Sequence, residues 1–188
     1  MSSNFAVLLT AVFYPLWLAA GLLDYLLHRR SRIELTSGRK ESWFHVLQFA
    51  SLAVAVLLVA FLEFTPLVFA AALACVFAHT LLAHADVTYT EGLRRISPLE
   101  QLVHGVLGVL PLAACGILAA LYWNDLRALP WTLQSRHPPL PWRATMLFVG
   151  SFFALGGLPI LEELLRTSGG LRHHQVKDRD QSGEGDYA

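Results

Sequence analysis

Three pairs of an acid and a histidine share one spacing in this sequence. The pairs, four residues apart in each case, are Asp24–His28, Glu41–His45 and Glu100–His104. On a helix, residues spaced in this way lie on one face, about 6 Å apart along the axis. Two more histidines, His79 and His84, fall within an apolar segment. Such groups together predict a metal centre, because imidazole suits zinc, iron and copper, and carboxylate suits harder ions.

The sequence around these pairs is strongly apolar. The chain has 188 residues, of which 55% are hydrophobic and 15% are charged, and its mean hydropathy is +0.49. Soluble domains are usually about 25% charged. The apolar residues fall in runs of about 20, the length that crosses a bilayer as a helix. We therefore predict an all-α integral membrane protein, a bundle of about five transmembrane helices at residues 5–27, 43–63, 66–85, 99–123 and 144–165.

The chain divides into two parts of different composition. Residues 1–166 hold all the apolar runs and are predicted to form the transmembrane bundle. Residues 167–188 are polar and mixed in charge, so we expect a disordered C-terminal tail. The formal net charge is zero, and nothing in the composition suggests a nucleic-acid partner. The sequence indicates no oligomeric state.

The basic residues predict the orientation of the bundle. Most of them lie in segments 28–42 and 86–98 and after residue 165, which fall on one side of a five-helix protein. Segment 124–143 carries the remaining basic residues on the other side. Because cytoplasmic loops carry an excess of Lys and Arg, we predict that the N-terminus is outside and the C-terminus inside. We expect the protein in the inner (cytoplasmic) membrane of a bacterium.

On this topology eight ionisable residues lie near the cytoplasmic ends of four helices, in two layers. The deeper layer is predicted to hold Asp24, His45, His79 and His104, and the shallower layer His28, Glu41, His84 and Glu100. Ionisable groups inside a bilayer are costly, so they pair, face the bundle interior and mark function. Each layer mixes imidazole with carboxylate, and the two layers together predict two metal ions.

Further residues could join this set. His79 and His84 are five residues apart, which is not one face of a regular helix, so either the helix unwinds locally or only one of them is a ligand. Glu162 and Glu163 end the fifth predicted helix on the same side, where a carboxylate could bind metal or orient a metal-bound imidazole. We select Asp86, Glu91 and Glu162 as second-tier candidates.

Several of these residues have simpler explanations when taken singly. Glu100 closes a capping box with Ser97 at a helix start. Glu41 opens a helix, where the dipole favours a negative charge. His28 precedes two arginines and could lie among lipid head groups. The same explanation does not suit His45, which has apolar neighbours, and the coincidence of all these residues at one depth favours a metal or cofactor site.

The motif His79-x-x-x-x-His84, together with the three acid–histidine pairs, resembles the membrane histidine-motif di-iron proteins, which include fatty acid hydroxylases, desaturases and sterol oxidases. The likeness covers residues 24–104 and concerns ligand type and location. It implies clustered histidines at the cytosolic ends of membrane helices that hold two metal ions and activate oxygen. The sequence lacks the His-x-x-His-His motif of that family and has acids where the family has imidazoles.

These features lead to one main functional hypothesis. We expect a membrane oxidoreductase whose two metal ions, iron by this hypothesis with manganese as an alternative, oxidise a lipid or another hydrophobic substrate, with an electron donor as partner. Glu41 and Glu100 are the predicted catalytic residues, because they would bridge the ions and accept protons. Three alternatives stay open: a zinc-dependent lipid hydrolase, a haem-binding electron-transfer protein that uses His45, His79 and His104, and an ion or proton transporter.

Overall fold

The structure, a computed structural model, describes residues 7–169. Its regular elements are η1 (Leu8–Phe13), α2 (Tyr14–Ser31), η2 (Ile33–Leu35), α3 (Gly38–Phe61), α4 (Pro66–Glu91), α5 (Pro98–Leu121), α6 (Trp123–Ala128), α7 (Trp142–Phe152) and η3 (Phe153–Gly157). Here η1 and η3 are π-helical and η2 is a 3₁₀ turn. Residues 158–169 continue α7 and η3 as a helix. No strand forms within the described residues.

Five helices are long and apolar enough to cross a membrane, as the sequence predicts. They run over Leu8–Ser31, Gly38–Phe61, Pro66–Glu91, Pro98–Leu121 and Trp142–Gly169. The shortest, with 24 residues, rises about 36 Å, which exceeds the roughly 30 Å of a bilayer core. The fifth helix continues past residue 166, the predicted end of the bundle. Residues 5–6 of the first predicted span and residues 170–188 of the expected tail lie outside the described residues.

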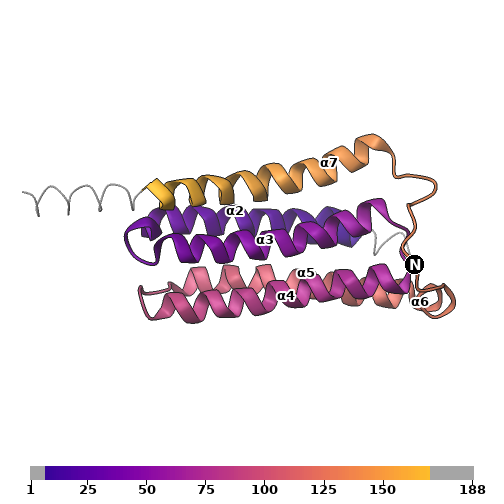
Figure 1. Cartoon of the computed structure of the whole chain (residues 1–188), viewed down its shortest axis with the longest axis horizontal. Helices are drawn as coiled ribbons and strands as arrows, with labels where there is room; N and C mark the ends of the chain where they lie inside the picture. Colours follow the sequence, from indigo (N-terminus) through magenta and orange to yellow (C-terminus); the bar gives the residue numbers. More distant parts are fainter. Residues whose placement is uncertain (1–6, 170–188) are drawn as a thin grey trace, which may run out of the picture.

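The first four of these helices form an antiparallel bundle, and the fifth covers one side of it. In Figure 1, α2 is seen behind α3 and α5 behind α4, with α7 above them; α3 packs mainly on α4 and α2 on α5, and the fifth helix contacts α2 and α3. The turns α2–α3 and α4–α5 lie at one end, which we call the site end. The opposite end, which holds the α3–α4 turn and α6, is called the distal end.

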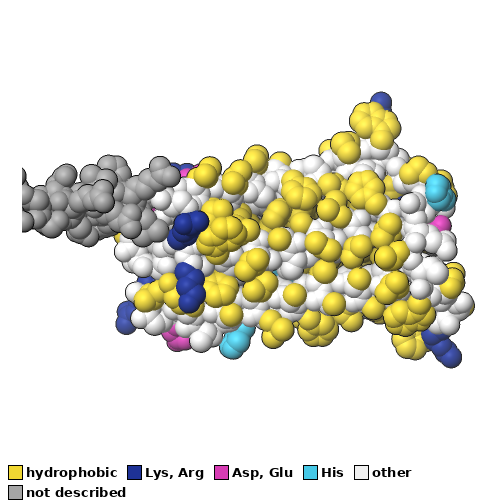
Figure 2. Space-filling model, in the orientation of Figure 1, with side chains coloured by type: hydrophobic (Ala, Val, Ile, Leu, Met, Phe, Trp, Pro, Cys, Tyr) yellow, Lys and Arg dark blue, Asp and Glu magenta, His cyan; other side chains and the backbone are white. Residues whose placement is uncertain are grey.

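The outer surface of the bundle is apolar along its length. Figure 2 shows hydrophobic side chains over the flanks of the helices, and charged side chains mostly toward the two ends. Large apolar side chains such as Phe77, Leu102 and Leu147 are exposed on these flanks. A surface of this kind needs lipid rather than water around it, so the chain is an integral membrane protein.

Local sequence signals set the starts of two helices at opposite ends. Thr65 caps α4, because its hydroxyl oxygen accepts the backbone N–H of Val68 at 3.3 Å. Ser97 caps α5, because its hydroxyl oxygen accepts the backbone N–H of Glu100. The backbone N–H of Ser97 donates in turn to the Glu100 carboxylate, which completes the predicted capping box. At the α2–α3 turn, Gly38 has a φ of +66°, which favours glycine. The turn at Gly38 and the cap at Ser97 thus fix where α3 and α5 begin at the site end, and the cap at Thr65 fixes where α4 begins at the distal end.

A long connection closes the distal end. After α6 the chain pairs with the α3–α4 turn: the backbone N–H of Glu63 donates to Gln134 and that of Arg136 to Phe61, both at 2.9 Å. The Arg136 guanidinium also donates to the Val59 carbonyl at 2.7 Å. These bonds satisfy backbone groups that the end of α3 leaves unpaired, and they tie the start of the fifth helix to the rest of the bundle.

Aromatic rings fill the middle of the bundle. Phe152 is buried and stacks on Trp17 and on Phe49, with centroid distances of 5.5 Å and 4.7 Å. The Phe49 ring lies so close to Gly156 that a Cβ added there would be 2.8 Å from its Cε2 atom. Glycine is therefore needed at this crossing of α3 and η3.

Replacing Gly156 by alanine should lower the thermal stability of the protein in detergent micelles. The new methyl group forces the Phe49 ring out of the stack, and overpacking of this kind costs about 1–3 kcal/mol. Gly116→Ala is the control, because nothing lies within 4 Å of a Cβ at that position and alanine favours a helix over glycine. Equal melting temperatures for the two variants would contradict this account of the crossing.

Candidate metal centre

Ionisable side chains from all five long helices meet inside the site end of the bundle. We call this set the polar cluster; it consists of Asp24, His28, Glu41, His45, Asp86, Arg94, Glu100, His104 and Glu163. Most of its side chains are buried, with less than a tenth of their surface exposed. Groups of this kind are almost never buried unless they are paired or bind a metal ion.

His28, on α2, lies at the centre of the polar cluster. Its Nε2 atom is 3.3 Å from a Glu100 carboxylate oxygen and 3.7 Å from oxygens of Asp24 and Glu41. Its Nδ1 atom is 3.2 Å from Glu163. The side chain is only 1% exposed. One imidazole therefore faces four carboxylates, which come from four different helices.

His45, on α3, is the second histidine at the centre. Its ring stacks on that of His28, with a centroid distance of 4.5 Å and an interplanar angle of 5°. Its Nδ1 atom is 2.6 Å from Glu163 and its Nε2 atom is 3.0 Å from Asp86. The Gln48 amide also donates to Asp86, at 3.2 Å. Glu163 thus uses one oxygen for each of the two central histidines.

The two remaining histidines of the bundle interior lie at the rim of this arrangement. The Nε2 atom of His104 is 3.2 Å from Asp24. His79 is buried toward the middle of the bundle, where its Nδ1 atom lies 3.3 Å from the carbonyl oxygen of Gln48. Both His79 and Asp24 line a small cavity of about 70 Å³ beside the central histidines. The open space of the site is therefore bounded by imidazole, carboxylate and apolar side chains.

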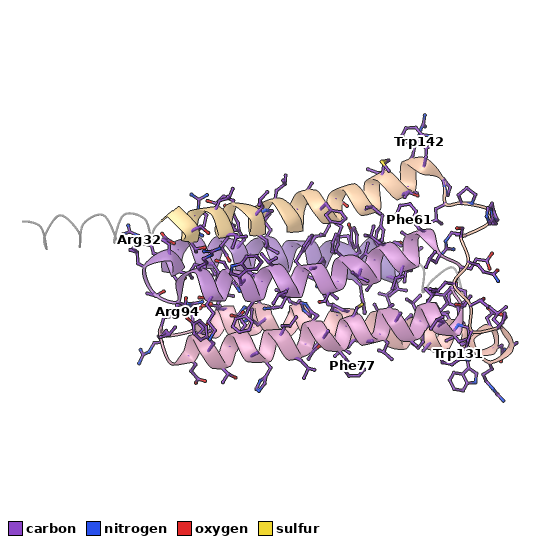
Figure 3. All side chains as sticks on the ribbon, in the orientation of Figure 1. Arg32, Phe61, Phe77, Arg94, Trp131 and Trp142 are labelled. Atoms are coloured by element: carbon purple, nitrogen blue, oxygen red, sulfur yellow. The ribbon has the colours of Figure 1, made fainter. Side chains whose placement is uncertain are left out.

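Arg94 joins the polar cluster from the α4–α5 turn (Figure 3). Its Nη2 atom lies 2.6 Å from Glu41 and 2.5 Å from Glu100. Burial alone would lower the pKa of the guanidinium, but the hydrogen bonds and charges of Glu100 and Glu41 outweigh it and hold the pKa above its usual value. The Arg94 charge thus lies directly opposite the negative charges of both carboxylates.

Three sets of side chains in the cluster have ligand atoms close enough to hold one ion. They are Asp24, His28 and His45; His28, Glu100 and His104; and Glu41, His45 and Asp86, with the ligand atoms of each set within 4.8 Å of one another. Each set combines one or two imidazoles with one or two carboxylates, which suits iron, manganese or zinc. Because the sets share His28 and His45, two neighbouring ions fit the geometry better than three.

Several polar atoms of the site are buried without a hydrogen bond to any described residue. They are Oδ1 of Asp24, Nε2 of His28, Nε2 of His79, Oδ1 of Asp86 and Nδ1 of His104. The 3.2 Å approach of His104 to Asp24 lacks the geometry of a hydrogen bond. Buried polar groups are nearly always satisfied, so these unpaired atoms fit a group bound between them.

The charge of the polar cluster also fits a further group bound within it. It holds five carboxylates against one guanidinium, which leaves a formal charge of −4 when the histidines are neutral. Such a charge cannot persist in a low-dielectric interior. Two divalent cations would balance it, whereas protons on the three histidines of the cluster would offset only three of the four charges. The unpaired ring nitrogens favour cations, because a protonated imidazole donates from both nitrogens.

The structure places three of the sequence candidates away from the polar cluster. His84 and Glu91 are exposed on the outer side of α4. Glu162 points to the surface, where it lies 3.8 Å from Arg29 and 3.4 Å from Arg166. The reason is helical geometry: with Asp86 and His79 facing inward, His84 lies roughly 140–160° around the helix from both. The remaining predicted positions, His79 included, lie in or beside the cluster.

Two members of the polar cluster were not selected from the sequence. Arg94 is next to Arg95 in a turn, and nothing local distinguishes the two. Glu163 has a detectable signal: Thr145, Phe152, Glu163 and Thr167 are buried at intervals of seven, eleven and four residues, which is one face of a helix. That pattern would have favoured Glu163 over Glu162.

Comparisons of this chain with protein families, with curated proteins and with solved structures found no match. The assignment of a function therefore depends on the chemistry of the site.

Replacing Arg94 by glutamine should destabilise the protein strongly. The change leaves Glu41 and Glu100 buried without their cation, and breaking a buried pair in this way typically costs about 3–5 kcal/mol. Arg95→Gln, an exposed neighbour in the same turn, is the matched control and should unfold like the wild type. Thermal unfolding in detergent measures both. If the two variants melt together, Arg94 is not the counter-charge of these carboxylates.

Proposed function

We propose that the polar cluster is a two-metal centre and that the protein is a membrane oxidoreductase, with iron as the metal and a lipid or other hydrophobic molecule as the substrate. The observation that carries this proposal is the combination, in the polar cluster, of three histidines with five carboxylates whose charge is not balanced and whose polar atoms are partly unpaired. The resemblance to membrane histidine-motif di-iron proteins supports the choice of iron.

The cluster divides naturally into two ligand sets. Asp24, His28, Glu100 and His104 come from α2 and α5 and would hold one ion; Glu41, His45 and Asp86 come from α3 and α4 and would hold the other. Glu163, from the fifth helix, reaches both central histidines and would link the two halves. Carboxylates that hold the free nitrogen of a metal-bound imidazole fix its orientation and raise its basicity.

The protein residues around the ions have distinct roles in this proposal. Bound iron would supply electron transfer and oxygen activation. Glu41 and Glu100 would accept protons, and Arg94 would hold both carboxylates in position and keep them ionised. The site cavity also has an apolar wall that includes Leu18, Phe49 and Leu52. That wall would keep water away from the ligands.

The size of the site supports metal ions rather than haem. A cavity of about 70 Å³ beside the central histidines is far below the roughly 300–1,000 Å³ of pockets that hold organic ligands. A zinc-dependent hydrolase would use the same ligands, so the identity of the bound metal distinguishes a hydrolase from an oxidoreductase. We further propose that the site end faces the cytoplasm, as its basic residues suggest, so that a soluble electron donor reaches it.

Protein purified in detergent should contain about two iron ions per chain and show no Soret band, by elemental analysis and an optical spectrum of the same sample. His104→Ala should lose bound metal while the protein still folds, because it removes a ligand atom near Asp24 and His28. His84→Ala, on the exposed side of α4, is the control and should keep its metal. Zinc in place of iron would favour a hydrolase. A strong Soret band would indicate haem and exclude both the di-iron oxidoreductase and the zinc hydrolase.

Glu163→Gln should reduce metal occupancy at least about tenfold, the size of effect common for groups that orient ligands, because it removes the charge that reaches both His28 and His45. Glu162→Gln changes the adjacent residue in the same way at a surface position, and its metal content should equal that of the wild type. Equal losses in both variants would mean that the fifth helix does not contribute to the centre as proposed.

A further inference from the structure

A second, larger cavity lies in the distal half of the bundle. It has a volume of about 290 Å³ and is lined almost entirely by apolar side chains of η1, α2, α3, α4, α5 and α7. Thr10 and Tyr14 are its polar residues, and the Tyr14 hydroxyl bonds to the Phe148 carbonyl and to Ser151, at 2.6 Å and 2.7 Å. Empty apolar cavities of this kind stay dry and bind apolar molecules.

The distal cavity and the site cavity meet in the middle of the bundle. Trp17 and Leu52 line both of them. The Trp17 indole is held in this wall by its stacking on Phe152 and by a hydrogen bond from Nε1 to the Leu107 carbonyl at 3.3 Å. Asp24 is seven residues from Trp17 on the same helix, or about 10 Å. The two cavities are therefore neighbours that share one wall, and a chain that reached from one to the other would displace the Trp17 ring.

We propose that the distal cavity binds the hydrocarbon tail of a single-chain amphiphile, such as a fatty acid or fatty alcohol, whose polar end lies at the polar cluster. The chain would pass Trp17 with its methyl end in the distal cavity. The inference rests on the proposed function, since it assigns the substrate of that same site, and it adds that the reaction takes place near the polar end of the chain.

The direction of the chain follows from the polarity of the two cavities. The distal cavity contains no ionisable side chain except Tyr14 and Cys115, and the Tyr14 hydroxyl is occupied by other partners. A carboxylate or hydroxyl placed there would lose its hydrogen bonds, which costs several kcal/mol for a charge. At the site end Tyr25 and Gln48 line the cavity together with the metal-ligand candidates. The polar end is thus favoured at the site.

The number of chains follows from the volume. An apolar cavity of about 150 Å³ accepts one benzene molecule, so 290 Å³ suits on the order of a dozen carbons of one chain. Two acyl chains joined by a glycerol would need a wider space. One hydrocarbon chain therefore fits the cavity, and the two chains of a membrane phospholipid do not fit in it together.

The test uses photoreactive fatty acids in full-length protein reconstituted in phosphatidylcholine nanodiscs. One probe carries a diazirine at the methyl end and the other carries it next to the carboxyl group; adducts are located by peptide mass spectrometry. We expect the methyl-end probe to label the distal cavity, at Val59, Phe64 and Leu118, and the carboxyl-end probe to label the site end. A phosphatidylcholine with the same methyl-end diazirine should label lipid-facing residues only.

Ala114, on α5, lines the distal cavity, so a larger side chain at this position tests the proposal by mutation. Ala114→Phe should reduce labelling of the cavity by the methyl-end probe at least about tenfold, because the phenyl ring would occupy the volume that the chain needs. Ala120→Phe, at an exposed position on the same helix, should leave labelling unchanged. Thermal unfolding of Ala114→Phe in detergent shows that the variant is folded, and the wild-type adduct map does not depend on it.

Three results would overturn the inference: labelling of the cavity by the phosphatidylcholine probe to the same extent, cavity adducts from both fatty-acid probes alike, or no effect of Ala114→Phe. The outcome is independent of the metal proposal. If the methyl-end probe labels the cavity of a protein that holds no metal, chain binding stands and the two-metal centre fails. If metal is present and the cavity is not labelled, the centre stands and the chain site fails.

Discussion

Charge balance inside an apolar bundle is the constraint on which the rest of this structure depends. Five carboxylates are gathered where neither water nor lipid can solvate them, and a single guanidinium, Arg94, is present to offset them. Removing one helix would leave its acid or histidine partners unpaired. The polar cluster therefore holds α2, α3, α4, α5 and the fifth helix in one arrangement, in a solvent where the hydrophobic effect does not drive helices together.

The fold was largely predictable from the sequence, because a bilayer allows few alternatives. Runs of about 20 apolar residues must form spanning helices whose backbone groups are satisfied internally. The capping box at Ser97 is likewise local, and the structure confirms it. At the site end the helices extend beyond their predicted ends because polar residues there, such as Arg29 and Glu41, continue the helix; hydropathy alone does not detect them. At the distal end, α3 and α5 stop at Phe61 and Leu121, two residues before their predicted ends.

The polar cluster was predictable only in part. The four-residue spacing predicted that Asp24 lies beside His28 and Glu41 beside His45, since both residues of such a pair share one face of a helix. The rotation of α4 about its axis is set by packing, and this is why His84 could not be separated from Asp86 beforehand. Arg94 reaches its partners from a turn, where no periodicity exists to predict its direction.

The positions of the charges along the helices have a consequence for biogenesis. Asp24 and His28 lie within two turns of the end of α2, and Glu41, Asp86, Glu100 and Glu163 are equally close to the site-end limits of their helices. A charge at the centre of a span costs roughly 2.5–3.5 kcal/mol on insertion, and long side chains near an end can reach the interface. Each helix can thus enter the bilayer alone with its charges hydrated. Glu163 belongs to the fifth of these spans in chain order, so the partners of His28 and His45 are all in the membrane only after that span has been inserted.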